Sequence, residues 1–175
     1  MKLWISVAAL ALTAAAARAE VMDATPSGFQ VKHAVEIAAP AVRVWASLLQ
    51  PATWWDSSHT WSGSAANLSL AAASGGCFCE RLPGGGSVLH MSTVYAQPGQ
   101  KLTLFGALGP LQSSGAAGHM SFGLAETDGK TTLTVTYDVG GYMKGGLDSI
   151  AAPVDGVIGQ QVVRLKRQIE TGNPG

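Results

Sequence analysis

The stretch IAAPVDGVIGQQVVRLKRQIETGNP, residues 150–174, decides the fold. Its apolar residues recur at the spacing of an amphipathic helix, and basic residues such as Lys166 and Arg167 lie off the apolar stripe. The stripe consists of Ile150, Val154, Val157, Ile158, Val162, Leu165 and Ile169. Gly172 follows as a typical helix-ending residue. The pattern predicts a helix over residues 150–169 that must cover an apolar surface.

Seven strand-like runs precede this helix. The first, Gly28–Ala39, alternates between apolar and polar residues, which is typical of a half-buried strand. Its apolar face carries Phe29, Val31, His33, Val35 and Ile37. The other six runs are Asn67–Ala73, Cys77–Leu82, Val88–Ala96, Lys101–Phe105, His119–Glu126 and Thr131–Val139. Glycine-rich turns such as Pro83–Gly86 separate them, so we expect an antiparallel meander.

Two short helices are expected between the first and second strands. Pro40 suits a helix start and Pro51 ends that helix, while Ala52–Ser58 predicts a second short helix or turn. A long amphipathic helix that follows a meander must lie across the concave face of a curved sheet. The sequence therefore predicts one α+β domain over residues 28–172. In it, a curved antiparallel seven-stranded sheet wraps round the C-terminal helix.

Composition narrows the class of function. The chain has 175 residues, which suits one ordinary domain. Its 11 basic and 11 acidic residues give a formal net charge of zero. A hydrophobic content of 47% supports a sizeable core and argues against disorder. Nucleic-acid binding would require clustered positive charge, so we expect no nucleic-acid partner.

The N-terminal segment has the layout of a secretory signal peptide. Lys2 precedes an apolar run, and Ala17 and Ala19 stand at the −3 and −1 positions of a cleavage site. We therefore expect residues 1–19 to be a signal peptide and residues 20–27 a polar leader. The mature protein would be periplasmic or secreted, without stable membrane insertion after cleavage. The alternative is an uncleaved N-terminal anchor.

Several motifs resemble the START/Bet v 1-like (SRPBCC) superfamily, in particular an exported bacterial subgroup among its polyketide cyclase/dehydrase-like members. They are IAAP at residues 37–40 followed by VW at 44–45, LGPLQ at 108–112, and YDVGGYMKGGL at 137–147. The resemblance covers nearly the whole mature chain. It implies a helix-grip fold with a cavity between the sheet and the last helix, used for an apolar or aromatic small molecule.

Tryptophans are the first candidate ligand contacts. Trp54, Trp55 and Trp61 cluster in the region that the resemblance places near the cavity mouth. An aromatic ring with one polar atom suits a flat or amphiphilic ligand. The alternative is that these rings only pack the short helices onto the sheet.

Five other residues are also candidate ligand contacts, and some of them are candidate proton carriers. They are His33, His90, His119, Tyr137 and Tyr142. His33 shares the inward face of the first strand, where a histidine is usually a hydrogen-bonded core residue. Glu80 and Asp138 are further candidate acids or bases, and no pattern chooses among them.

The cysteines Cys77 and Cys79 admit two interpretations. A disulfide is permitted in an oxidising compartment, but strand residues two apart lie about 6.6 Å from each other, near the upper limit for a bridge. We therefore favour two buried thiols. A hairpin centred on Gly84-Gly85 would place His90 opposite Cys79, which suggests a zinc or copper site. Because no metal-ligand spacing supports that site, we predict no metal and no cofactor.

Two functions remain. The first is an exported binding protein that holds a small apolar or amphiphilic molecule. The second is a cyclase- or dehydratase-type enzyme that uses inward polar residues of the same cavity. The chain has no G-x-S-x-G motif and no phosphate-binding loop between a strand and a helix. A chaperone cofactor is disfavoured because the Hsp90-like partners of such proteins need ATP and lie inside the cell. We favour the binding protein.

Overall fold

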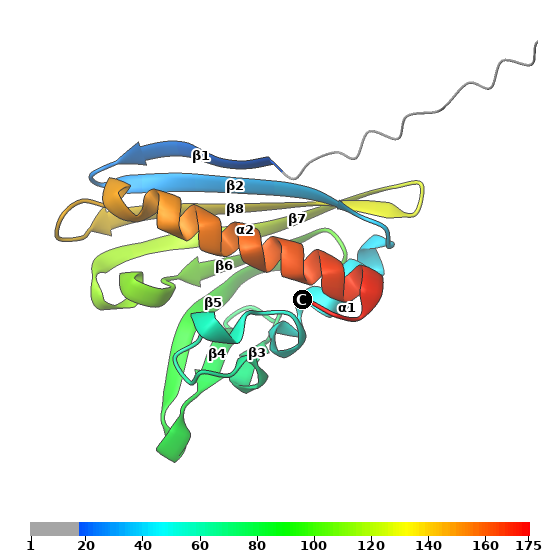
Figure 1. The fold of residues 1–175 in the computed structure, drawn as a ribbon, viewed down its shortest axis with the longest axis horizontal. Helices are drawn as coiled ribbons and strands as arrows, with labels where there is room; N and C mark the ends of the chain where they lie inside the picture. Colours follow the sequence, from blue (N-terminus) through cyan, green and yellow to red (C-terminus); the bar gives the residue numbers. More distant parts are fainter. Residues whose placement is uncertain (1–17) are drawn as a thin grey trace, which may run out of the picture.

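A long C-terminal helix, α2 (Asp148–Thr171), lies along one face of an antiparallel sheet (Figure 1). The structure is a computed structural model that describes residues 18–175. Of the predicted signal peptide, residues 1–17 lie outside the described residues. Within the described part, no helix is long and apolar enough to cross a membrane.

The sheet has eight strands in the order β1-β2-β8-β7-β6-β5-β4-β3, with every neighbouring pair antiparallel. The strands are β1 (Arg18–Thr25), β2 (Gly28–Ile37), β3 (Leu68–Leu70), β4 (Cys77–Arg81), β5 (Ser87–Gln97), β6 (Lys101–Gly106), β7 (Gly115–Thr127) and β8 (Lys130–Tyr142). Figure 1 shows the sheet curving round α2. The predicted α+β helix-grip architecture is therefore confirmed.

The eighth strand is β1, which the sequence pattern does not predict. Most of the expected polar leader, residues 20–27, lies in this strand, where Val21 pairs with Val31 and Thr25 with Gly28. The side chains of residues 22–25 are exposed, so the segment shows no apolar alternation. Backbone hydrogen bonds to β2 hold it in the sheet, and Val21 is its side chain that packs against the core.

The segment between β2 and β3 contains one α-helix, α1 (Ala41–Leu48), which begins directly after Pro40. The second predicted helix, Ala52–Ser58, is replaced by short 3-10 turns. These turns are Pro51–Thr53, Ser57–His59 and Ala65–Asn67. The carboxylate of Asp56 accepts a hydrogen bond from the Ser58 amide, and such a local bond favours a turn over a continued helix.

The two halves of α2 have different surroundings. In the C-terminal half, Val162, Leu165 and Ile169 are buried against the sheet. In the N-terminal half, Val154 and Val157 are only half-buried. The apolar stripe is therefore continuous in sequence, but its side chains are fully buried only from Ile158 onwards.

Leu165→Ala should lower the free energy of unfolding by about 2–5 kcal/mol, because it leaves a cavity in the packed half of α2. Urea unfolding followed by circular dichroism measures this change. Val163→Ala, on the exposed side of the same helix, is the control and should change stability by less than about 1 kcal/mol. Equal effects of the two substitutions would place the buried face of α2 elsewhere.

Candidate functional site

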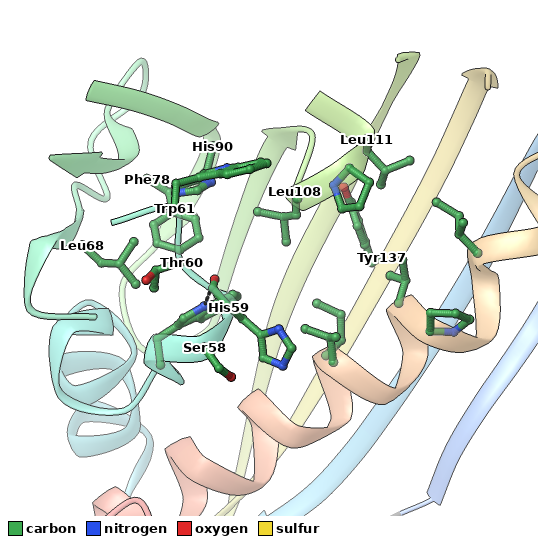
Figure 2. Close-up of a pocket in the computed structure, with 18 residues that line it drawn as sticks. Ser58, His59, Thr60, Trp61, Leu68, Phe78, His90, Leu108, Leu111 and Tyr137 are labelled. Carbon is green, nitrogen blue, oxygen red and sulfur yellow. Dashed lines mark hydrogen bonds between the residues drawn. The ribbon is translucent and has the colours of Figure 1, made fainter. Parts of the chain in front are cut away.

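A cavity of about 400 Å³ lies between the sheet and the N-terminal half of α2 (Figure 2). Four segments line it: the first turns of α2, the loop after β6, the turn region between α1 and β3, and the strands that carry Phe78, His90 and Tyr137. The volume falls in the range of small-molecule sites, about 300–1,000 Å³.

The cavity wall is mainly apolar. Val154, Val157 and Ile158 line it from α2, and Leu108 and Leu111 line it from the loop after β6. Among the described residues that line it, none is an aspartate, glutamate, lysine or arginine. A charged ligand would therefore lose its hydration there without gaining an ionic partner.

The three candidate tryptophans have different positions. Trp55 is buried, lines the cavity, and donates its Nε1–H to the His59 carbonyl oxygen at 3.0 Å. Trp61 is 58% exposed at the mouth, where its Nε1–H donates to Gln112 Oε1 at 2.7 Å. Trp54 is buried outside this cavity and bonds to the Ser47 carbonyl oxygen. The packing interpretation therefore fits Trp54.

Tyr137 of β8 is the most deeply buried polar residue among the described residues of the cavity wall. Its side chain is 0% exposed, and its ring packs edge-on against Phe29 with ring centroids 6.2 Å apart. Its hydroxyl has no well-formed hydrogen bond to any described residue, although the Leu108 backbone lies near it. Burial raises the pKa of this hydroxyl well above its ordinary value, and the Leu108 backbone opposes this in part. Tyr137 is therefore a neutral hydrogen-bond donor.

His90 and Glu80 form a buried pair at the mouth end. His90 Nε2 lies 3.0 Å from Glu80 Oε2, and the same carboxylate accepts hydrogen bonds from the amides of Trp61 and Ser62. Glu80 thereby anchors the segment that carries Trp61. The other ring nitrogen of His90, Nδ1, lies 3.5 Å from Gln112 Nε2.

The surroundings of this pair favour an ionised carboxylate and a neutral imidazole. Burial alone would raise the pKa of Glu80, but hydrogen bonds from Ser62, Trp61 and His90 outweigh it and hold that pKa below its ordinary value. Burial also lowers the pKa of His90, and the nearby Glu80 only partly opposes this. His90 Nε2–H then donates to Glu80, and Nδ1 remains as an acceptor. A neutral imidazole held by a carboxylate is competent to accept a proton.

A β-bulge turns His90 inward. Phe78 pairs with Met91 but Cys79 pairs with Leu89, so His90 is an extra residue in β5. Both His90 and Met91 are buried as a result. The uniform hairpin register expected from the sequence is correct at Cys77, which pairs with Ser92, and wrong from Cys79 onwards.

The cluster of Cys77, Cys79 and His90 that a uniform register would bring together does not form. Phe78 and Glu80 face the core, and Cys77 and Cys79 alternate with them on the opposite face of β4, away from His90. Within residues 18–175, no group of three or more His, Cys, Asp or Glu side chains could hold a metal ion. The preference for two free thiols is also wrong, since Cys77 and Cys79 form a disulfide. Their Cα atoms lie 5.3 Å apart, closer than in a regular strand, because the pairing with β5 is irregular at this point.

Three other candidates lie outside the cavity. His33 is buried beneath α2, with Nε2 2.8 Å from Asp155 Oδ1, and Gly159 leaves room for its ring. His119 is exposed on the outer face of β7 beside Phe105. Tyr142 is exposed at the end of β8. The cavity therefore brings together Trp55, Trp61, His90 and Tyr137 from the predicted set.

Sequence reasoning did not assign a binding role to the loop after β6 or to the first turns of α2. Leu108 and Leu111 stand in the LGPLQ motif, where Gly109–Ser113 forms a 3-10 turn. Gln112 of this motif bonds to Trp61 across the mouth. The feature of the sequence that could have indicated this role is a loop of apolar residues interrupted by glycine and proline.

Comparisons with known proteins identify the fold. No protein-family model matches the sequence, and no curated protein matches it. Among solved structures, DynU16, a protein in the dynemicin biosynthetic locus, has a TM-score of 0.57 and 23% identity over 83% of this chain, which spans 48% of DynU16. CalU16 from Micromonospora echinospora has a TM-score of 0.56 and 15% identity, covering 92% of this chain and 88% of its own. The Aha1 dimer from Colwellia psychrerythraea has a TM-score of 0.55 and 17% identity, covering 82% of this chain and 97% of its own. These neighbours are consistent with a Bet v 1-like helix-grip fold.

Glu80→Gln should lower the free energy of unfolding by about 1–3 kcal/mol at about pH 7, because an amide offers one acceptor oxygen where three donors converge. The folded pKa of Glu80 is depressed, so its ionised form stabilises the fold at neutral pH. This contribution is lost as the pH falls through the folded pKa. In urea unfolding, the difference between wild type and variant should therefore shrink at about pH 3.

Glu36→Gln, at an exposed carboxylate paired with Lys130, is the matched control and should change stability little at either pH. A Glu80→Gln effect that stays the same at both pH values would show that the charge of Glu80 does not stabilise the fold.

Proposed function

We propose that this protein is an exported member of the START/Bet v 1-like superfamily that holds an uncharged apolar or aromatic small molecule in its cavity. The observation that carries the proposal is the cavity of about 400 Å³ with an apolar wall and a small number of polar atoms. Such a site gains binding free energy mainly by removing apolar ligand surface from water, at about 25 cal/mol per Å².

The mouth of the cavity supports ligand exchange. Trp61 and Gln112 come from two separate segments, and one hydrogen bond between their side chains joins these segments. The Trp61 ring is largely exposed although it lines the cavity. An aromatic ring that is solvated in the free protein gains buried surface when a ligand lies beside it.

The disulfide supports the proposed location. Cys77 and Cys79 are paired, and disulfides persist in oxidising compartments such as the periplasm or the cell exterior. This agrees with the signal peptide expected for residues 1–19. Export after cleavage remains part of the proposal.

A second candidate function has one specific observation in its favour. The Glu80–His90 pair resembles a base held in position by a carboxylate, at the edge of a mainly apolar cavity. This is the arrangement that a cyclase- or dehydratase-type enzyme would need. If a substrate is found that turns over, His90→Gln should abolish turnover while the variant still binds an apolar probe.

Binding is tested directly with the uncharged fluorescent probe N-phenyl-1-naphthylamine. Wild type should bind it saturably, whereas Val157→Trp should weaken binding by about tenfold or more because the indole fills the cavity. Val163→Trp, on the exposed side of α2, is the control and should bind as wild type does. Absent or unsaturable binding in wild type, or equal binding in both variants, would overturn the proposed site.

A further inference from the structure

The Tyr137 hydroxyl is a buried donor in the wall of the cavity, without a well-formed hydrogen bond to any described residue. Tyr137 lies in the wall of the cavity, between the loop of Leu108 and Leu111 and the helix α2 (Figure 2). We infer that the cavity selects uncharged aromatic molecules that carry a hydrogen-bond-accepting oxygen, such as an aryl ketone, and that Tyr137 donates to that oxygen. This inference rests on the proposed function.

An unpaired buried hydroxyl raises the free energy of the folded protein. Buried polar groups in folded proteins almost always have a hydrogen-bond partner, and an unsatisfied one is costly. Phenylalanine would fill the same space beside Phe29 without that cost. A ligand oxygen that accepts from Tyr137 removes the cost, whereas a pure hydrocarbon leaves the donor unpaired.

The position of the hydroxyl is fixed, which makes it selective. The Tyr137 side chain is fully buried and its ring is held edge-on by Phe29. The donor therefore cannot turn away into solvent when a ligand without an acceptor enters. A fixed donor distinguishes ligands by where their oxygen lies.

Most other polar side chains in the cavity wall are already engaged, and His59 contacts Gln160 Oε1 through Nε2 at 3.2 Å. His90 Nε2 is paired with Glu80, and its Nδ1 lies near the Gln112 amide. Ser58 and Thr60 lie near the mouth, where Thr60 Oγ1 donates to the Ser57 carbonyl oxygen. Tyr137 is therefore the donor whose hydrogen bonding a ligand oxygen would improve most.

The lining also favours an uncharged, flat ligand. None of the described lining residues is acidic, lysine or arginine, so a carboxylate on the ligand would meet no permanently charged counter-ion. Trp55 and Phe78 meet edge-on with ring centroids 5.4 Å apart and line the cavity together. Aromatic walls interact favourably with an aromatic ligand beyond the area that they bury.

Two ligands of the same shape test the inference. 2-Acetylnaphthalene carries a carbonyl oxygen, and 2-isopropenylnaphthalene carries a CH₂ group in its place. Their dissociation constants are measured by displacement of N-phenyl-1-naphthylamine. The ketone is better hydrated in water than the hydrocarbon, so their dissociation constants differ for reasons unrelated to Tyr137. The quantity compared between variants is therefore the ratio of the two dissociation constants. Tyr137→Phe should shift this ratio against the ketone by about five- to tenfold relative to wild type.

Tyr142→Phe makes the same substitution at an exposed tyrosine of the same strand, and should leave the ratio unchanged. A readout that needs no variant is the carbonyl stretching frequency of the bound ketone, which should fall below its value in hexane when the oxygen accepts a hydrogen bond. 2-Naphthoate, which carries a full charge, should bind about tenfold or more weakly than the ketone.

The outcomes separate the inference from the proposed function. If wild type binds neither naphthalene, the proposed function fails and the inference fails with it. If both bind, but the ratio is unchanged in Tyr137→Phe and the carbonyl frequency equals that in hexane, only the inference is overturned.

Discussion

The packing of the C-terminal half of α2 against the sheet is the contact on which the rest of the structure depends. Val162, Leu165 and Ile169 are buried there, which fixes the helix at one end of the sheet. Towards the other end of the helix, the apolar side chains of Val154 and Val157 face an open space that the loop after β6 also lines. The same amphipathic stripe thus provides core packing in one half and a ligand-sized wall in the other.

The mouth of that space depends on a second constraint, the irregular pairing of β4 with β5. One extra residue in β5 brings His90 inward, where it meets the carboxylate of Glu80. That carboxylate also accepts two backbone amides of the Trp61 segment. A local irregularity of the sheet therefore determines where the mouth lies and which polar groups stand beside it. The disulfide lies at the same irregularity on the opposite face of β4.

Much of the fold could be predicted, because each long element has a clear apolar period. The five inward residues of β2 are buried as expected, and the helix predicted over residues 150–169 lies within α2. The edge strand β1 could not be predicted this way, since exposed side chains give no period and its stability comes from backbone pairing. The segment Ala52–Ser58 is too short and too rich in turn-forming residues for its hydrogen-bond pattern to be predicted.

The site was harder to predict than the fold. Trp55, Trp61, His90 and Tyr137 do meet in the cavity, but His33, His119 and Tyr142 do not. The bulge could not be foreseen, because a uniform hairpin register is equally compatible with the alternation in β4 and β5. This one-residue shift exchanges the expected Cys79–His90 pairing for the Glu80–His90 pair. Similarly, nothing in the spacing shows that half of the α2 stripe would line a cavity.

The most direct test of this account is the methyl NMR spectrum of the protein titrated with 2-acetylnaphthalene. A bound aromatic ring shifts the resonances of the methyl groups beside it. The account predicts large shifts for Val154 and Val157, in the first half of α2, and small ones for Val162 and Leu165, in the packed half. Shifts centred instead on the outer face of the sheet, around Met22 and Ala117 in the hollow beside His119, would contradict it.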